Sequence, residues 1–290
     1  MALLFAKSAC LTPNFLRQCF SCSGGLSLKT TEPAIHVSSS LAVLLSELDK
    51  HTSNVSTGDK KIILTPPSSC VVPNELGRLN RRVIKCKECP RLAAYIREVG
   101  REKVKRFDGE KYWARPLPSW GDPNARLLIV GLAPAAHGGN RTGRMFTGDS
   151  SGDWLARAMH ESGFASKPAS SAKDDGLVLS DTYITAAVRC APPDNKPLPA
   201  ELTNCSKYLS AELGILSRVQ VVLALGRIAF DAYCKAIGAE RLVFAHGARF
   251  EVSGRTLLAS YHPSRQNTNT GRLTWDMWSA IFKTAKSALR

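Results

Sequence analysis

The sequence lacks any stretch close to the roughly 18 uninterrupted apolar residues of a membrane-spanning helix. Acidic residues are also scarce, because 24 Asp and Glu stand against 39 Lys and Arg, for a formal charge of +15. Residues 76–290 alone hold 33 basic and 19 acidic residues, a net +14. Such a surplus predicts salt-sensitive attraction to a polyanion, so we expect a nucleic acid rather than a membrane as the partner.

The number of cysteines is not even, as full pairing in disulfide bonds would require. The chain has nine, and its 290 residues can build a core without disulfide bonds as supports. We therefore expect reduced thiols, some of them holding a metal ion or a cluster. The length favours one folded domain with an extension.

The N-terminal part has a composition unlike the rest. Residues 1–31 contain Ser, Thr and three basic residues but no acid, which is typical of a transit peptide for a mitochondrion or plastid rather than for nuclear entry. Residues 32–75 are rich in Ser, Thr and Pro and lack aromatic residues, so we interpret them as a flexible linker with one helical candidate, 41–50. The folded domain is predicted at 76–290.

Four apolar, β-branched-rich runs alternate with helical patterns in this domain. The runs are Arg126–Ala133, Thr182–Val188, Val219–Leu225 and Thr256–Tyr261. The helical patterns are Leu76–Val99 with a break at Pro90, Ser151–Ser162, Ala200–Leu216, Arg227–Ile237 and Thr274–Leu289. Continuous apolar strands predict a parallel sheet covered on both faces. We predict an α/β fold, a three-layer α/β/α sandwich with a central, mainly parallel four-stranded sheet, whose ligands bind beyond the carboxyl ends of the strands.

Two of the loops after these strands carry long motifs. The first reads GLAPAAHGGNRTGRMFTGD from Gly131 to Asp149, and the last begins HPSRQNT at His262. A phosphate cradle would suit a glycine-rich loop, but the P-loop Lys-Ser/Thr and the GxGxxG spacing are absent. The two motifs, in this order, closely resemble the type B, family 5 uracil-DNA glycosylases of the iron-sulfur branch. The resemblance covers about Leu79 to the C-terminus.

Four cysteines have a spacing that suits one metal centre. Cys86 and Cys89 form a CxxC before Pro90, Cys190 follows the second strand, and Cys205 lies in or near a helix. Spacing alone leaves zinc and a 4Fe-4S cluster open. The resemblance implies the 4Fe-4S cluster, with a structural role that joins the N-terminal helix to the loop after the second strand. No function is assigned to Cys10, Cys19, Cys22, Cys70 and Cys234.

The resemblance also implies roles around an extruded base. Phe146 would stack on the base, His262 would donate a hydrogen bond to its oxygen, and Asp149 would orient water or stabilise the sugar cation. Asp149 could equally cap the following helix. Further base-pocket residues are expected at Gly131, Ala133, Pro134, His137, Asn140 and Ala186.

One position departs from the family pattern. The resembling families have Asn-x-Val-Arg/Lys-Cys before the third cysteine, and the asparagine contacts the uracil edge, whereas this chain has Ala186. Loss of that side chain predicts a relaxed pocket that also accepts other deaminated or damaged bases.

Positive side chains lie on the same strand-end loops. We expect phosphate contacts from Arg141, Arg144, Arg189, Lys196, Ser264, Arg265 and Arg272. The segment Arg265–Gly271 is expected to enter the duplex, with Gln266 and Asn267 filling the vacated space.

These features predict a monomeric, monofunctional glycosylase of base-excision repair that removes uracil from single- or double-stranded DNA. Neither motif has a lysine that could form a Schiff base. Two alternatives stay open. One is a catalytically weak or inactive binder of abasic or damaged DNA with the same fold, and the other is a zinc-stabilised RNA-binding module.

Overall fold

The computed structural model describes residues 30–31, 61–62, 72–239 and 242–289. The chain divides into two units between Ser68 and Ser69, and in the first unit the strands β1 (Thr30–Thr31) and β2 (Lys61–Ile62) pair antiparallel. The expected transit peptide and linker lie mostly outside the described residues, as do the helical candidate at 41–50 and Cys10, Cys19, Cys22 and Cys70. The second unit holds every other predicted feature.

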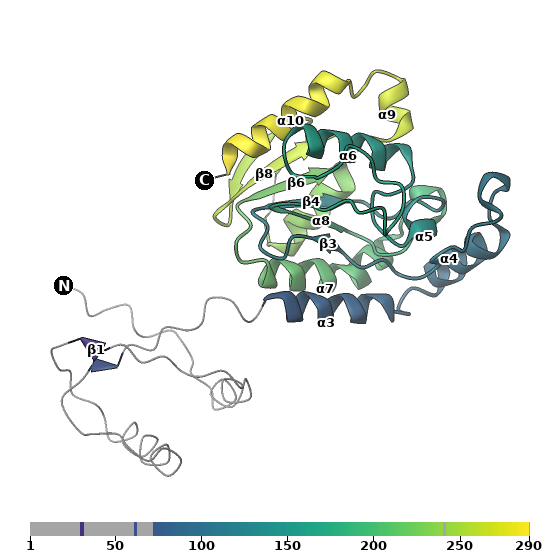
Figure 1. The fold of residues 1–290 in the computed structure, drawn as a ribbon, viewed down its shortest axis with the longest axis horizontal. Helices are drawn as coiled ribbons and strands as arrows, with labels where there is room; N and C mark the ends of the chain where they lie inside the picture. The colour runs from purple at the N-terminus through teal and green to yellow at the C-terminus, as the bar shows by residue number, and fades with distance from the viewer. Residues whose placement is uncertain (1–29, 32–60, 63–71, 240–241, 290) are drawn as a thin grey trace, which may run out of the picture. The chain divides into compact units, whose positions relative to one another are not determined.

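A six-stranded sheet forms the middle of this unit, in the order β3-β5-β4-β6-β8-β7 (Figure 1). Its four inner strands are parallel and match the four predicted ones: β5 (Thr182–Ala186), β4 (Leu127–Gly131), β6 (Val221–Leu225) and β8 (Arg255–Ser260). All residues of β4, β5 and β6 are buried, as continuous apolar runs predict.

The predicted count of four strands was too low. Antiparallel strands β3 (Trp120–Gly121) and β7 (Arg249–Val252) close the two edges of the sheet. β3 has only two residues, and β7 alternates exposed with half-buried side chains. Neither strand forms the apolar run by which the inner strands were found.

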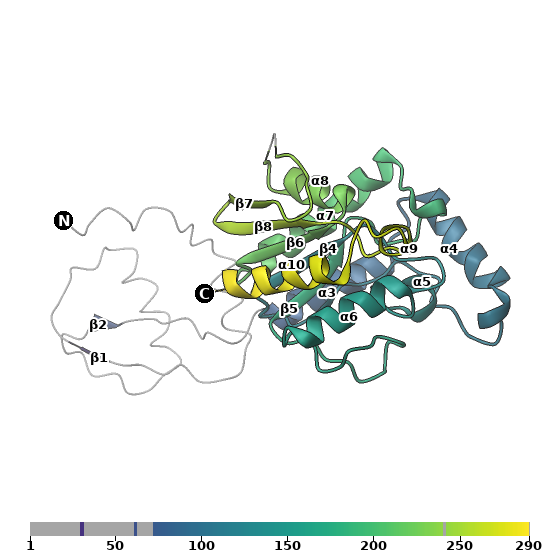
Figure 2. The ribbon, with the colours of Figure 1, turned by 90° about the horizontal axis from the view of Figure 1, so that it is seen from above.

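Helices cover both faces of the sheet. In Figure 1, α6 (Ser150–Glu161) and α10 (Trp275–Ala288) lie above the strands, and α3 (Val72–Ile84) and α7 (Pro199–Ile215) lie below them. α8 (Arg227–Ala236) packs on α7 and β6, and α10 packs on β6 and β8, along which it runs in Figure 2. Alternate residues of β4 enter two separate cores, since Ile129 packs on the α6 and α10 side and Leu128 on the α7 and α8 side. This arrangement confirms the predicted three layers.

The predicted helix Leu76–Val99 is two helices. α3 ends at Ile84, and α4 runs over Pro90–Glu102 with Pro90 in its first turn, where the missing N–H needs no partner. The CxxC therefore lies in the connection between them. A short 3₁₀ turn, η2 (Lys105–Phe107), follows α4.

The parallel strands end at one edge of the sheet. Gly131 pairs with Ala186, and Leu225 pairs with Ser260. The loops beyond this edge contain the short elements α5 (Gly139–Thr142), η3 (Pro193–Asn195) and α9 (Arg265–Asn269). No helix in the described part of the chain has the length and apolar character needed to cross a membrane.

Candidate active site at the carboxyl edge of the sheet

An aromatic pair joins the loops after β4 and β8. The Phe146 ring stacks on the His262 imidazole, with ring centroids 5.9 Å apart and planes inclined by 28°. A Cβ atom added to Gly131 would lie 2.7 Å from Cζ of Phe146, so the strand end has to be glycine for the ring to lie over it. Phe146 has a φ of 52°, which is a left-handed backbone conformation. For a residue other than glycine this conformation costs on the order of 1 kcal/mol or more, so contacts of the surrounding loop have to stabilise it.

His262 stands at the carboxyl end of β8 as a neutral imidazole. Burial lowers the pKa of His262 to about 4, which leaves one ring N–H as a donor at neutral pH. Asn267 in α9 donates its amide N–H to the His262 carbonyl oxygen at 2.8 Å. This bond fixes the backbone of the histidine at the start of its loop.

Asp149 is the N-cap of α6. Its Oδ1 accepts the Gly152 backbone N–H at 2.9 Å, which confirms the helix-cap interpretation. Its Oδ2 lies so close to Gly138 that an added Cβ would be 1.9 Å away. Burial raises the pKa of Asp149, although the backbone N–H groups of Gly152 and Ser151 oppose the change. A carboxylate with a raised pKa is a stronger proton acceptor, which fits the catalytic role that stays a prediction.

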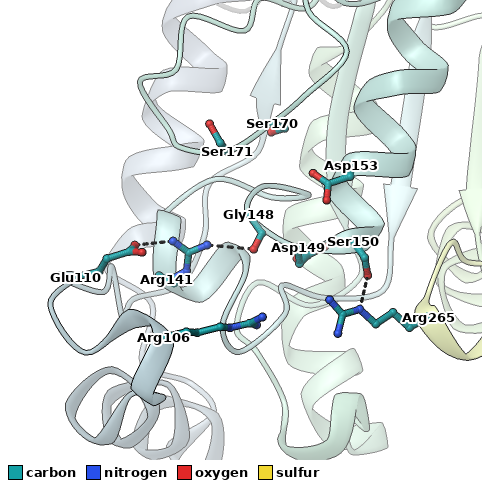
Figure 3. A pocket seen from close by; sticks show the side chains of 10 residues that line it. All are labelled: Arg106, Glu110, Arg141, Gly148, Asp149, Ser150, Asp153, Ser170, Ser171 and Arg265. Atoms are coloured by element: carbon teal, nitrogen blue, oxygen red, sulfur yellow. Dashed lines mark hydrogen bonds and ion pairs between the residues drawn. The ribbon is translucent and has the colours of Figure 1, made fainter.

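A cavity of about 550 Å³ opens beside Asp149 (Figure 3). We call it the Asp149 cavity. Its lining is Arg106, Glu110, Arg141, Gly148, Asp149, Ser150, Asp153, Ser170, Ser171 and Arg265. Neither Phe146 nor His262 belongs to this lining. The aromatic pair and the polar cavity are therefore two separate features, and the loop segment from Phe146 to Asp149 contributes residues to both.

Ala186 closes the end of β5 directly beside Gly131. Only 2% of the residue is exposed, and it packs in the same core that Phe146 contacts. A methyl group there offers no hydrogen bond to a base edge, as the sequence predicts.

Other residues of the first motif face inward. Asn140 is fully buried, and its amide nitrogen donates to the Ile96 carbonyl oxygen of α4 at 3.3 Å. This bond ties α5 to α4, whereas the Asn140 Oδ1 has no hydrogen-bond partner among the described residues, and the expected base contact of Asn140 stays a prediction. His137 contacts the Tyr112 hydroxyl through Nδ1 at 3.1 Å, and burial lowers the pKa of His137.

Ala133 and Pro134 have packing contacts within the protein. Ala133 packs in the small core that contains the predicted cluster cysteines. Pro134 is buried, and its Cβ lies 3.1 Å from where a Cβ on Gly139 would be. Both residues therefore help to pack the loop after β4, and their expected contacts with the base stay predictions.

The four predicted ligands Cys86, Cys89, Cys190 and Cys205 line one small space between α4, α7 and the loop after β5. The Arg189 backbone N–H donates to Sγ of Cys205 at 3.3 Å, and the Asn204 amide contacts Sγ of Cys89 at 3.6 Å. Burial raises the pKa of Cys205 to about 11, so the metal-free thiol is protonated at neutral pH. No three His, Cys, Asp or Glu side chains of the described chain are already arranged to hold a metal ion. The donor set and the N–H bonds to sulfur suit a thiolate-bound centre, which would form with loss of the thiol protons.

Comparison with known proteins places the chain in a family. The model of the uracil DNA glycosylase superfamily matches residues 118–286. The chain belongs to this superfamily. The type-5 uracil-DNA glycosylase of Thermus thermophilus is 54% identical over 205 residues, which are 69% of this chain and 92% of that protein. The type-5 uracil-DNA glycosylase of Pyrobaculum aerophilum is 47% identical over 204 residues, 70% of this chain and 89% of that protein.

The identification of family 5 from the two motifs is thereby confirmed. A type-4 uracil-DNA glycosylase of Pyrobaculum aerophilum is more distant, at 27% identity over 197 residues, 66% of this chain and 83% of that protein.

Two arginines expected at the DNA backbone are internal in this superfamily member. Arg189 pairs with Glu212 at 2.6 Å, and its side chain is 1% exposed. Arg144 pairs with Asp175 at 2.6 Å and is 6% exposed. Both predicted phosphate contacts were wrong, because each charge is already neutralised inside the protein.

The other expected backbone contacts differ in accessibility. Arg141 is largely buried and pairs with Glu110 at 2.5 Å, but it borders the Asp149 cavity. Ser264 is half-buried at the N-cap of α9. Exposed side chains remain at Lys196, Arg265 and Arg272. Phosphate binding by these exposed residues stays a prediction.

The Asp149 cavity also contains residues that sequence reasoning missed. Arg106, Glu110 and Asp153 carry charge there, and Ser170 and Ser171 add hydroxyl groups. The basic, aromatic-containing stretch before Trp120 could have indicated a role for Arg106, but this stretch belongs to neither of the two motifs.

Proposed function

We propose that this protein is a uracil-DNA glycosylase that hydrolyses the bond between uracil and deoxyribose during base-excision repair. The observation that carries the proposal is the Phe146–His262 pair over Gly131, with Asp149 on the same loop. The type-5 uracil-DNA glycosylases that share 47–54% of the matched residues support it.

Phe146 and His262 act on the base. The extruded base lies against the Phe146 ring, and stacking offsets part of the cost of leaving the helix. As the N-glycosidic bond breaks, its electron pair moves onto the base, and negative charge grows on the base oxygen. The neutral His262 donates its N–H to that oxygen, an interaction that strengthens as the charge develops.

Asp149 acts on the sugar side. Its carboxylate stabilises the cationic sugar and accepts a proton from water, whose oxygen forms the new bond to C1′. None of the residues lining the Asp149 cavity is a lysine. We therefore expect water, rather than a lysine amine, to attack the sugar. Without a Schiff base between a lysine and the sugar, the enzyme itself should not cleave the strand.

Ala186 sets the range of substrates. With a methyl group beside Gly131, the base edge meets no side-chain amide at this position. We infer that the enzyme also removes other deaminated bases, with backbone groups at the end of β4 supplying part of the recognition.

A duplex with one uracil tests the activity. The purified protein should leave an alkali-labile site at the uracil, and Asp149→Asn should leave far fewer. Intact strands after alkali treatment, together with tight binding to an abasic duplex, would favour the alternative of a non-catalytic damage-binding protein.

We also propose a structural 4Fe-4S cluster on Cys86, Cys89, Cys190 and Cys205. Bound there, it supplies thiolate cross-links rather than reaction chemistry. The four sulfur atoms would join the connection between α3 and α4 to α7 and to the loop after β5.

The visible spectrum of anaerobically purified protein tests the cluster. Broad iron–thiolate absorption should be present in the wild type, absent in Cys205→Ser and retained in Cys234→Ser, since Cys234 lies in α8 outside the four-cysteine space. A colourless protein that contains zinc would overturn the assignment.

We propose further that the protein acts as a monomer on DNA and that residues 1–31 direct it to a mitochondrion or plastid. Light scattering with and without a DNA duplex tests the first point. Imaging of residues 1–31 fused to a fluorescent protein tests the second.

A further inference from the structure

Three arginines border the Asp149 cavity, and they differ in what neutralises them. Arg141 pairs with Glu110 at 2.5 Å. Arg265 donates to the Ser150 hydroxyl at 3.2 Å, and its charge partly opposes the rise in the pKa of Asp153 that burial causes. Arg106 is exposed and forms no ion pair with any residue in the described part of the second unit. Of the three cations, Arg106 is therefore the one that has neither an ion pair nor a side-chain hydrogen bond among the described residues.

The Arg106 guanidinium is held in place although it is exposed. It lies over the ring of Phe107, with its central carbon 4.5 Å from the ring centroid. The Arg141 guanidinium also lies over this ring, at 3.8 Å. Phe107 therefore links the free cation to the internal one. A guanidinium that rests on an aromatic face keeps its N–H edge available for two parallel hydrogen bonds to a phosphate.

The cavity presents this cation toward Asp149. In Figure 3, Arg106 and Arg265 reach toward the centre from opposite sides, below Asp149, whereas Glu110 turns toward Arg141. Arg106 comes from η2 before the sheet, and Arg265 comes from α9 after the last strand. Two distant segments thus bring positive charge to one polar space beside the proposed catalytic carboxylate.

We infer that the Asp149 cavity binds a phosphodiester group of the damaged strand, with Arg106 as its principal ligand. The inference rests on the proposed function, since it takes DNA as the substrate. Asp149 acts at the sugar, and the phosphates joined to that sugar must lie next to it. The cavity is polar and excludes Phe146 and His262, so it suits the nucleotide backbone rather than the base.

Salt dependence of DNA binding tests the assignment. The substrate is a duplex with a tetrahydrofuran abasic analogue, which cannot be cleaved at a glycosidic bond. Each phosphate contact contributes about 0.9 to the slope of log K against log salt concentration. Arg106→Ala should lower the magnitude of the slope by about that amount, and Arg106→Lys should keep the slope while binding more weakly, because a lysine retains the charge but not the paired N–H groups.

Arg101→Ala is the matched control. Arg101 lies near the end of α4, is 74% exposed, pairs with Glu102 at 3.4 Å and does not border the cavity. Its removal changes the net charge equally and should leave the slope unchanged. Equal melting temperatures of the two alanine variants would exclude a folding defect as the cause.

The outcomes separate this inference from the proposed function. If the wild type excises uracil but Arg106→Ala has the slope of Arg101→Ala, Arg106 is an ordinary solvated charge and only this inference fails. If the slope falls in Arg106→Ala but the wild type leaves uracil in place, the phosphate site stands and the activity fails. Absence of salt-dependent binding by the wild type would overturn both.

Discussion

The rings of Phe146 and His262 stack at a centroid distance of 5.9 Å, although the loops after β4 and β8 that hold them are far apart in the sequence. They meet because β4 and β8 flank β6 in the sheet and all three strands run parallel. Gly131, the last residue of β4, leaves the space that the Phe146 ring occupies. The position of the Phe146 ring therefore depends on the missing Cβ of Gly131.

Gly131→Ala should impair excision while leaving the fold intact. The new Cβ would lie 2.7 Å from Phe146, so the ring has to move by a few tenths of an ångström or more. Small misplacements near a reacting group can lower rates by about 100-fold, and we expect kcat/KM to fall between tenfold and that limit. Gly109→Ala is the control, because nothing lies within 4 Å of its added Cβ. A Gly131→Ala enzyme within twofold of the wild type would contradict this account.

Asp149→Asn should lose activity and gain stability. Burial raises the pKa of Asp149 in the folded protein, so the folded state binds the proton more tightly than the unfolded state does. Ionisation at neutral pH therefore costs stability, and this cost disappears as the pH falls below both pKa values. Asparagine removes the charge and still caps α6. We expect the melting temperature of Asp149→Asn to exceed that of the wild type by a few degrees at pH 7 and to equal it in acid. Wild-type excision should also be lost in acid, where Asp149 is protonated.

Asp276→Asn is the control for this comparison. Asp276 is an exposed acid in the first turn of α10, so its neutralisation removes a favourable interaction with the helix N-terminus rather than a burial cost. Its melting temperature should stay the same or fall slightly. A lower melting temperature of Asp149→Asn at pH 7 would show that the carboxylate contributes more as a charged cap than its burial costs.

The features that could be predicted from the sequence are those that depend on short, local residue patterns. Continuous apolar runs located the four inner strands, and Asp149 before a helical pattern indicated a cap. The edge strand β7 could not be found this way, because its exposed face carries no apolar signal. Arg144 and Arg189 have the sequence context of surface charges. Their burial depends on Asp175 and Glu212, which only the tertiary fold brings to them.

Glu212→Gln should be strongly destabilising. Glu212 is fully buried, and its Oε2 accepts hydrogen bonds from Arg189 and from the Thr185 hydroxyl, both at 2.6 Å. Removing its charge leaves the buried Arg189 uncompensated, which typically costs about 3–5 kcal/mol. Glu161→Gln breaks the exposed pair with Arg157 and should cost less than about 1 kcal/mol. Urea unfolding followed by circular dichroism measures both, and similar small losses would show that the Arg189 charge reaches solvent or another partner.

Ala186→Asn should sharpen the preference for uracil. The new amide would project from the end of β5 beside Gly131, where a base edge has no side-chain partner in the wild type. A two-point hydrogen bond to a base discriminates by about 1–3 kcal/mol, so the ratio of kcat/KM for uracil over hypoxanthine should rise roughly tenfold or more. Ala187→Asn adds the same amide one residue later, just beyond the end of β5, and should leave the ratio unchanged. Relative rates for uracil, hypoxanthine and mismatched thymine that stay the same in Ala186→Asn would mean that backbone groups alone determine which base is removed.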